Sequence, residues 1–549
     1  MRQLLLLSLL SFIFSCEPQK QNDEATSTPT GNDSTRGIVK TDTIYLTRNE
    51  SITPANSYSD LFVDSSILEN YIQRHKLSTA DAQGIRSFYN YRNFQFAWFS
   101  SEGLTEELKG FWNLQDRSPA ADKTLRNKMD TLLLNSDTLT FSRFDTTILN
   151  TEIALTNAWL QFYNRNHDKI KFSAIGPEKI IPVKKIPVLT LADSIIGQPD
   201  DTSFSMHQYG LLKQKLKQLD SIAKSGGWHP LVFTVKQMKK GTSSPFVLQF
   251  KKRLQLTGDF NNTDTSKTFN DSLEIAIKNY QRTSGMRPTG IITDTIIRSL
   301  NIPVLVRMQQ LILNLNRMQW MPAVRNTNYI SVNIPEFMLS VFENNNKVFD
   351  MPVVVGKEGT STTMFNGDLN QIVFSPYWNI PASIVQREIL PALKLDKDYL
   401  KKHNMEVTGK NDSLPVIRQL PGKDNGLGKV KFLFPNRYDI YFHDTYAKDI
   451  FTKQKRTSSH GCIRLADAEK MANYLLRNNS DWTPAKVHTA MNATKEQFVK
   501  VSPPVPVIIT YFTSWVDENG QLNYRDDIYS HDKNTGLMLF GNSIASSGK

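Results

Sequence analysis

Hydrophobic and polar positions follow two different periods along the chain, and the change falls near residue 327. Before it, apolar residues recur at helical spacing, most clearly in residues 151–164 and 209–223. These segments predict a mainly helical region over residues 59–245, which offers no catalytic grouping and to which we assign a scaffold role. After residue 327 apolar and polar residues alternate, and this pattern predicts β-strands.

The alternating region begins with a segment that turns at Asn344-Asn345-Asn346 and predicts a β-hairpin. The stretches "QIVFSPYWNIP", "KVKFLFP", "DIYFHDT" and "VPVIITYFTSWV" continue as strands. Residues 382–428 interrupt them as a long insertion with a helical start, which is typical of a lid. A helix is expected over residues 466–477 from its apolar spacing. We therefore expect a multidomain α+β chain, with a β-rich catalytic domain over 327–515 and a C-terminal extension over 516–549.

Residues 246–302 form a separate unit between these regions. Two helical stretches, 246–256 and 272–282, precede a Gly/Pro loop and a last short helix that Asp294 is expected to cap. The unit resembles the peptidoglycan-binding type 1 module, a small three-helix bundle. The resembling residues are Phe250, Leu254, Ala276, Ile277, Tyr280, Gln281, Gly285, Gly290, Ile292, Thr295 and Leu300. The alternative is a helical linker subdomain without ligand affinity. A connecting helix is expected over 303–326.

The amino terminus changes what the net charge of +12 implies. A charge of this sign suggests an anionic partner, and nucleic acid is the first candidate. However, a basic start, eleven mostly apolar residues from Leu4 to Phe14 and then Ser15-Cys16 are typical of a secretory signal. Residues 13–16 resemble a lipobox, in which Cys16 is lipidated; the alternative is an ordinary signal peptide. Residues 17–58 predict a flexible tether. We therefore expect a periplasm-facing lipoprotein of the cell envelope, held to a membrane only by its lipid, without a nucleic-acid partner.

The chain has only two cysteines, and the second, Cys462, lies in the segment "SSHGCIRL". If Cys16 carries lipid, Cys462 has no partner within the chain, in a compartment where disulfides form. An unpaired thiol in that compartment is open to unwanted disulfide formation unless it has a functional role, so Cys462 is the candidate nucleophile. A thiol must become a thiolate to attack a carbonyl, and a helix amino terminus and a nearby histidine both promote this. The helix expected after Leu465 supplies the first of these.

Two of the nine histidines are candidates for the nearby histidine that would promote formation of the thiolate. If "DIYFHDT" is a strand, Tyr441 and His443 share one face and can line a cleft, while their neighbours enter the core. His443 is therefore the candidate general base. His460, two residues before Cys462, either orients the loop or polarises the carbonyl under attack. With a thiolate–imidazolium pair or its equivalent, activity is expected to fall on acidification.

Two further residues of this loop have candidate roles. The backbone N–H groups around Gly461 and Cys462 are candidates for an oxyanion hole, since glycine permits a tight turn and close approach. Ser459 either stabilises the turn or supports the histidines with its hydroxyl.

The spacing of these residues carries a resemblance to a known family. His443, fifteen intervening residues and then Ser459-His460-Gly461-Cys462 match the signature of the YkuD-type L,D-transpeptidases. Further agreements are "VNIP", "VVVGK", "SPYWNIP", "LGKVKFLFPN" and "YFHDT". The chain resembles the large YcbB-like subgroup, which has a helical scaffold, a peptidoglycan-binding module and a capping insertion, over most of residues 70–530. Small members often carry Asn where Arg464 stands, and the larger subgroup commonly has Arg.

The resemblance implies a two-step acyl transfer on peptidoglycan stem peptides. Cys462 attacks a tetrapeptide donor, D-alanine leaves, and the side-chain amine of a diamino acid on a neighbouring stem resolves the thioester into a 3→3 cross-link. Arg464 then either holds a stem carboxylate or forms a structural ion pair, and Tyr441 and Trp378 either line the substrate site or pack in the core. No metal or other cofactor is implied, and cell-wall synthases are further partner candidates.

Three other functions remain open at this level. An L,D-carboxypeptidase uses the same Cys/His apparatus with water as the acceptor. A non-catalytic wall-binding lipoprotein uses only the unit at 246–302. A cysteine peptidase of another fold is more remote, because the histidine precedes the cysteine in a β-rich order.

Overall fold

The computed structural model describes residues 44–115, 123–136, 139–166, 176–198, 207–321, 327–411 and 414–541. The predicted signal, Cys16 and the tether as far as residue 43 lie outside these ranges. Within them, no single helix is both long and apolar enough to cross a membrane; one bent pair, Asp294–Leu300 with Val304–Gln319, meets that test on length and composition alone.

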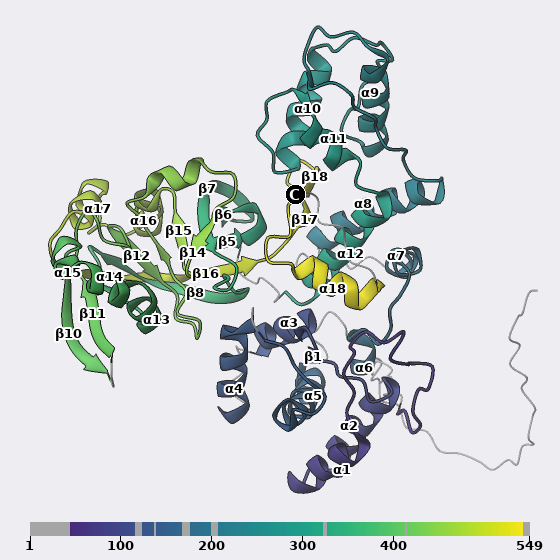
Figure 1. Cartoon of the computed structure of the whole chain (residues 1–549), viewed down its shortest axis with the longest axis horizontal. Helices are drawn as coiled ribbons and strands as arrows, with labels where there is room; N and C mark the ends of the chain where they lie inside the picture. The colour runs from purple at the N-terminus through teal and green to yellow at the C-terminus, as the bar shows by residue number, and fades with distance from the viewer. Residues whose placement is uncertain are drawn as a thin grey trace, which may run out of the picture. The chain divides into compact units, whose positions relative to one another are not determined.

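Helices dominate the chain before residue 225, as the apolar spacing predicts (Figure 1). They are α1 (Ser65–Arg74), α2 (Thr79–Tyr91), α3 (Glu106–Gln115), α4 (Lys123–Leu134), α5 (Thr146–Asn166), α6 (Pro177–Ile180), α7 (Val188–Gly197) and α8 (His207–Lys224), with the short pair β1 (Phe99–Ser100) and β2 (Gly103–Leu104). Their core is aromatic: Trp159 packs edge-on against Trp98 and Phe111, with ring centroids 6.2 and 5.2 Å away. Edge-to-face rings of this kind add to the stabilisation from burial alone.

Residues 231–300 enclose a hydrophobic core of their own. The elements here are β3 (Gln237–Met238), α9 (Pro245–Thr257), α10 (Asp271–Thr283), β4 (Ile292–Thr293) and α11 (Asp294–Leu300), and α12 (Val304–Gln319) follows. Phe250, Leu254 and Ile277 are fully buried between the helices. The expected cap at Asp294 is wrong. Thr293 precedes the helix without a side-chain cap bond, and the Asp294 carboxylate instead pairs with Arg298 one turn on.

A nine-stranded sheet forms the β-rich region, in the order β14-β7-β15-β13-β12-β8-β16-β5-β6. The strands are β5 (Tyr329–Asn333), β6 (Met338–Glu343), β7 (Asn346–Gly356), β8 (Phe365–Phe374), β12 (Val430–Leu433), β13 (Phe442–His443), β14 (Thr457–Ser459), β15 (Ile463–Leu465) and β16 (Gln497–Thr510). Because β6 also pairs with β7, the ladder closes on itself. The predicted hairpin turn is present, with Asn344 and Asn345 at φ 49° and 63°, the left-handed conformation that a two-residue hairpin turn needs.

The insertion has a small sheet and a core separate from the main sheet (Figure 1). It contains α13 (Ala382–Ile384), the π-helical turn η5 (Val385–Ile389), α14 (Leu390–Leu395), α15 (Tyr399–Lys402), β10 (Met405–Asn411) and β11 (Leu414–Gln419), and β11 pairs with β9 (Trp378–Asn379), which lies just before the insertion. The helical start is therefore as predicted, whereas the antiparallel pair β10–β11 carries no clear alternation and was not expected. Ile384, Val385, Ile389 and Ile417 are its buried apolar centre.

The remaining elements follow the sheet or lie in its loops. They are the turns η4 (Ile334–Glu336) and η6 (Lys448–Thr452), the helices α16 (Ala468–Leu476) and α17 (Pro484–Met491), the pair β17 (Ser514–Val516) and β18 (Leu522–Tyr524), and α18 (His531–Phe540). Helical segments followed by a β-rich region make the chain a multidomain α+β protein, as expected.

Candidate active site

The pairing of two short strands brings the predicted site residues together. β13 and β15 run parallel, with Phe442 opposite Ile463 and His443 opposite Arg464. The Ile463 N–H donates to the Tyr441 carbonyl over 3.1 Å, so Cys462 lies next to Tyr441 at the end of the ladder. The rings of Tyr441 and His443 lie 5.8 Å apart between centroids, so they share one side of the strand as its period predicts.

The Cys462 thiol is free and partly buried, and three groups contact its sulfur. The Asp439 carbonyl lies 3.5 Å away and accepts the S–H, while the backbone N–H and the hydroxyl of Tyr441 donate to the sulfur. Burial raises the pKa of the thiol to about 11; the two Tyr441 bonds and the Arg464 cation lower it, and the Asp439 carboxylate raises it further. The resting sulfur is therefore protonated at neutral pH.

His443 is a buried, neutral imidazole, only 4% exposed. Its Nδ1 lies 2.6 Å from the Asp444 carbonyl, and because a carbonyl only accepts, Nδ1 carries the hydrogen and Nε2 keeps the lone pair. Burial and then the Arg464 cation lower the pKa of His443 to about 4; the Asp444 carbonyl and carboxylate and the Leu427 carbonyl favour the protonated ring and offset this only in part.

The expected thiolate–imidazolium pair is therefore not the resting state. With the pKa of Cys462 near 11 and that of His443 near 4, the proton stays on sulfur. Among the described residues no hydrogen bond joins the two side chains, since the thiol is directed to Asp439. Catalytic hydrogen bonds are often long without substrate and tighten when it binds. The arrangement suits a general base that takes the proton as the sulfur attacks.

The loop before the cysteine is a tight turn held by the Ser459 hydroxyl. Gly461 has φ 109°, a conformation that favours glycine. The Ser459 hydroxyl donates to the Cys462 carbonyl over 2.5 Å and accepts from the Gly461 N–H over 3.3 Å. Of the two predicted oxyanion donors, the Gly461 amide is thus already occupied. The Cys462 amide has no hydrogen-bond partner within the described ranges and is the donor that remains.

The expected contribution of a helix dipole to the thiol is wrong. The strand β15 (Ile463–Leu465) separates Cys462 from α16, whose amino terminus is capped by Asp467 through a 2.9 Å bond to the Lys470 N–H. An extended residue advances about 3.3 Å, whereas the effect of a helix end fades within its first turn. Tyr441 and Arg464 supply the stabilisation that the sequence assigned to the helix.

Arg464 has no carboxylate partner in the part of the chain that the structure describes. Its Nε is buried without a hydrogen bond, so the predicted structural ion pair is not found. Burial lowers the pKa of its guanidinium, which nevertheless remains a cation, and its charge lowers the pKa values of both Cys462 and His443. Together with Tyr441, Arg464 therefore lies within electrostatic range of the thiol.

The other two predicted residues contact the insertion. His460 is 40% exposed, and its Nε2 lies 3.0 Å from the Glu388 carboxylate on η5. Trp378 lies partly buried against the core of the insertion, and a Cβ at Gly426 would approach its ring to 2.8 Å. The Trp378 ring thus packs against the insertion, and His460 connects the cysteine loop to it.

Two contributors were not predicted from the sequence. The Asp439 carbonyl faces the thiol because Asp439 has φ 51° and because the Asn436 side chain bonds the backbone of Tyr438 and Ile440. Thr362 bonds the cysteine loop from about a hundred residues away. In the sequence, the "PNRYD" loop is only a weak indication that Asp439 takes a left-handed conformation. No sequence pattern indicates the contact that Thr362 makes with the cysteine loop.

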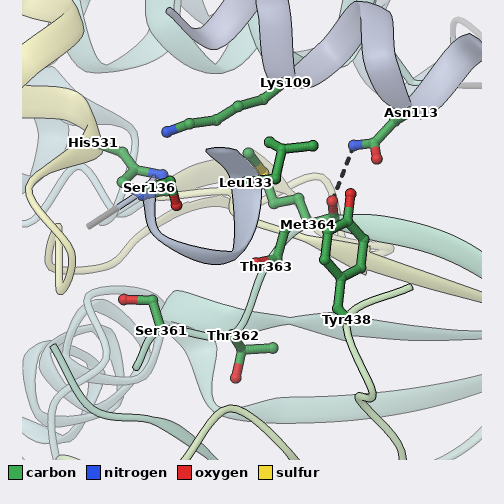
Figure 2. A pocket seen from close by; sticks show the side chains of 10 residues that line it. All are labelled: Lys109, Asn113, Leu133, Ser136, Ser361, Thr362, Thr363, Met364, Tyr438 and His531. Carbon is green, nitrogen blue, oxygen red and sulfur yellow. Dashed lines mark hydrogen bonds between the residues drawn. The ribbon is translucent and has the colours of Figure 1, made fainter. Parts of the chain in front are cut away.

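A cavity lies beside the segment 361–364 that follows β7 (Figure 2). Its lining includes Lys109, Asn113, Tyr438 and His531, and the Asn113 amide donates to the Met364 carbonyl over 3.0 Å. Neither Cys462 nor His443 lines it. This cavity is therefore not the place where a substrate meets the thiol.

Residues 327–509 match the family model of the L,D-transpeptidase catalytic domain, YkuD. The chain contains an L,D-transpeptidase catalytic domain. Residues 83–216 match a model described as a scaffold domain. The site residues from Tyr441 to Arg464 all lie inside the L,D-transpeptidase match.

One curated relative and two solved structures serve as comparisons. A Haemophilus influenzae protein named "Putative L,D-transpeptidase" is 29% identical over 245 residues, which is 42% of this chain and 49% of that protein. The chain therefore spans about half the length of this curated relative. The solved L,D-transpeptidase from Mycobacterium smegmatis is 13% identical, covers 34% of this chain and 58% of its own, and has a TM-score of 0.19. That from Stackebrandtia nassauensis is 13% identical, covers 52% and 97%, and has a TM-score of 0.22. The assignment rests on the family match.

Proposed function

We propose that the chain is a peptidoglycan L,D-transpeptidase that forms 3→3 cross-links between stem peptides. One observation carries the proposal: inside an L,D-transpeptidase domain, β13 and β15 place the Cys462 thiol beside Tyr441 and on the side of the sheet where His443 is held as a neutral base. The proposed chemistry uses no metal or cofactor.

In the first step, His443 Nε2 takes the thiol proton while the sulfur bonds to the carbonyl carbon of the third stem residue. The Cys462 N–H stabilises the oxyanion. Collapse breaks the amide bond to the terminal D-alanine, which leaves with the proton from the imidazolium, and a thioester remains. In the second step, a side-chain amine of a neighbouring stem attacks the thioester, His443 again transfers the proton, and the thiol is restored.

Two neighbouring groups have supporting roles in this scheme. The Tyr441 hydroxyl donates to the sulfur and stabilises it as negative charge develops. The buried Arg464 Nε has no partner in the described part of the chain, so the guanidinium can bind a carboxylate of the stem peptide through two parallel hydrogen bonds.

The wider setting belongs to the same proposal. A lipid on Cys16 would anchor the protein to a membrane facing the periplasm, and the three-helix unit at 246–302 would hold peptidoglycan near the catalytic domain. A net charge of +12 suits the anionic wall and not a nucleic acid in this compartment. Cell-wall synthases are candidate partners that supply new stems.

The test is to incubate the purified chain with disaccharide-tetrapeptide and to analyse the products by mass spectrometry. We expect 3→3 dimers and free D-alanine from the wild type, and neither from Cys462→Ala. Tripeptide monomers alone would instead assign an L,D-carboxypeptidase. Equal products, or none, from wild type and Cys462→Ala would leave only a wall-binding role.

A further inference from the structure

The Thr362 hydroxyl both accepts and donates a hydrogen bond next to the cysteine loop. The side chain is 2% exposed and lies in the connection between β7 and β8. Its Oγ1 lies 2.9 Å from the Gly356 nitrogen and 2.8 Å from the Gly461 carbonyl oxygen. Because the Gly356 amide must donate, the single hydroxyl proton has to go to the Gly461 carbonyl. The direction of both bonds is therefore decided by their chemistry.

The backbone around Thr362 is built to bring it there. At Gly356 a Cβ would lie 2.1 Å from the Thr360 carbonyl, so only glycine lets the chain fold back at the end of β7. The Lys357 N–H donates to the Ser459 carbonyl over 3.0 Å. The Tyr529 hydroxyl bonds both ends of the turn, donating to the Gly356 carbonyl and accepting from the Thr362 N–H. The turn is a rigid support for the loop that carries Cys462.

The bond to Gly461 has a geometric consequence for the oxyanion donor. The Gly461–Cys462 peptide is trans, so its carbonyl and the Cys462 N–H lie in one plane and point in opposite directions. Thr362 holds the carbonyl, and the N–H therefore points away from Thr362. A hydrogen bond accepted by the carbonyl also polarises the peptide and strengthens its N–H as a donor. Within the residues that the structure describes, the Cys462 N–H has no hydrogen-bond partner.

We propose that Thr362 is a positioning residue: its hydroxyl sets the Gly461–Cys462 peptide plane so that the Cys462 N–H meets the oxyanion of the tetrahedral intermediate. The role rests on the proposed acyl transfer to Cys462. It acts on the rate of acylation and not on donor binding, since the peptide plane contacts the oxyanion and Thr362 itself contacts no substrate.

The experiment compares three variants of the full chain. Thr362→Val keeps the shape and removes the hydroxyl, and Thr362→Ser restores the hydroxyl. Thr363→Val is the matched control, because the neighbouring threonine is half-buried and makes no hydrogen bond within the described residues. The readouts are acylation by disaccharide-tetrapeptide as a function of donor concentration, measured by intact mass, and alkylation of Cys462 by iodoacetamide.

Removing one oxyanion donor typically slows acylation about 100- to 1,000-fold, and a misdirected donor costs less. We expect Thr362→Val to lower the saturated acylation rate about 10- to 100-fold with an unchanged half-saturating donor concentration. Thr362→Ser should recover most of the rate. Alkylation should not change, because displacement of iodide develops no oxyanion.

Two outcomes would overturn the inference while leaving the proposed function intact. One is a wild-type acylation rate in Thr362→Val. The other is an equal loss of acylation and alkylation in that variant, which would show general loosening of the loop. If the wild type itself forms no acyl-enzyme, the proposed function fails and the role of Thr362 fails with it.

Discussion

Replacing Tyr441 by phenylalanine removes one of the two donors that Tyr441 directs at the Cys462 sulfur. The hydroxyl is hydrogen-bonded to the thiol; burial first, and then the contact with Cys462, raises the pKa of Tyr441 well above its usual value. The backbone N–H of residue 441 stays in the variant. The substitution therefore tests one hydrogen bond to the thiolate while the strand pairing that places the thiol is kept.

The size of the effect follows from the charge on the sulfur. A hydrogen bond to a charged group contributes about 1.5–3 kcal/mol, and one pKa unit corresponds to about 1.4 kcal/mol. From the wild-type value of about 11, the pKa of Cys462 should rise by about one to two units in Tyr441→Phe. Since only the thiolate reacts, alkylation at pH 8 should slow about 10- to 100-fold.

The assay is iodoacetamide alkylation between pH 7 and pH 10, with the modified peptide identified so that Cys16 does not contribute. The logarithm of the wild-type rate should rise with unit slope and without a plateau, because the pKa lies above this window. Tyr438→Phe is the control, since Tyr438 is a buried tyrosine of the same loop that lines the neighbouring cavity. A neutral plateau in the wild type, or overlapping profiles for wild type and Tyr441→Phe, would refute the reasoning.

Three further changes test other parts of the site and fold. His443→Gln should slow acylation about 100- to 10,000-fold and leave alkylation at pH 9 unchanged. In the wild type, acylation should persist from pH 8 to pH 5 and fall only as His443 becomes protonated near pH 4. A midpoint of the wild-type pH profile near 6.5 would contradict the effect of burial on His443. Arg464→Gln should raise the half-saturating donor concentration about 10-fold or more, and an unchanged value would exclude a carboxylate contact. Lys251→Met should increase hydrogen exchange over residues 262–270, because the buried ammonium bonds Asp264, Ser266 and Thr268 there; the exposed Lys252→Met should not.

Much of the secondary structure was predictable because it depends on local periodicity. Residues 151–164 and 209–223 lie inside α5 and α8, whose apolar residues recur every turn. The turn at Asn344 and Asn345 follows from the low cost of left-handed backbone at asparagine. Strand partners were not predictable, because pairings such as β16 with β5 join residues more than 170 positions apart.

Within the site, too, the local features around Cys462 were predictable from the sequence, whereas the contacts between strands were not. The scarcity of cysteine singled out Cys462, and the strand pattern singled out His443 and placed Tyr441 on the same strand face. The sequence did not show that Tyr441 contacts the sulfur, because that contact depends on the parallel register of β13 and β15. The assigned helix dipole was wrong for a related reason, since a three-residue strand is too short to be recognised between a loop and a helix.

The amino-acid sequence by itself determined the candidate nucleophile, the candidate base and the glycine turn, which together carry the resemblance to a known family. Only the tertiary structure decided the protonation states and the supporting contacts. Burial raises the pKa of Cys462 and lowers that of His443, and burial is set by packing from the whole domain. Thr362 reaches Gly461 through a turn that begins more than a hundred residues earlier. These properties arise from long-range packing, which a local pattern of residues does not encode.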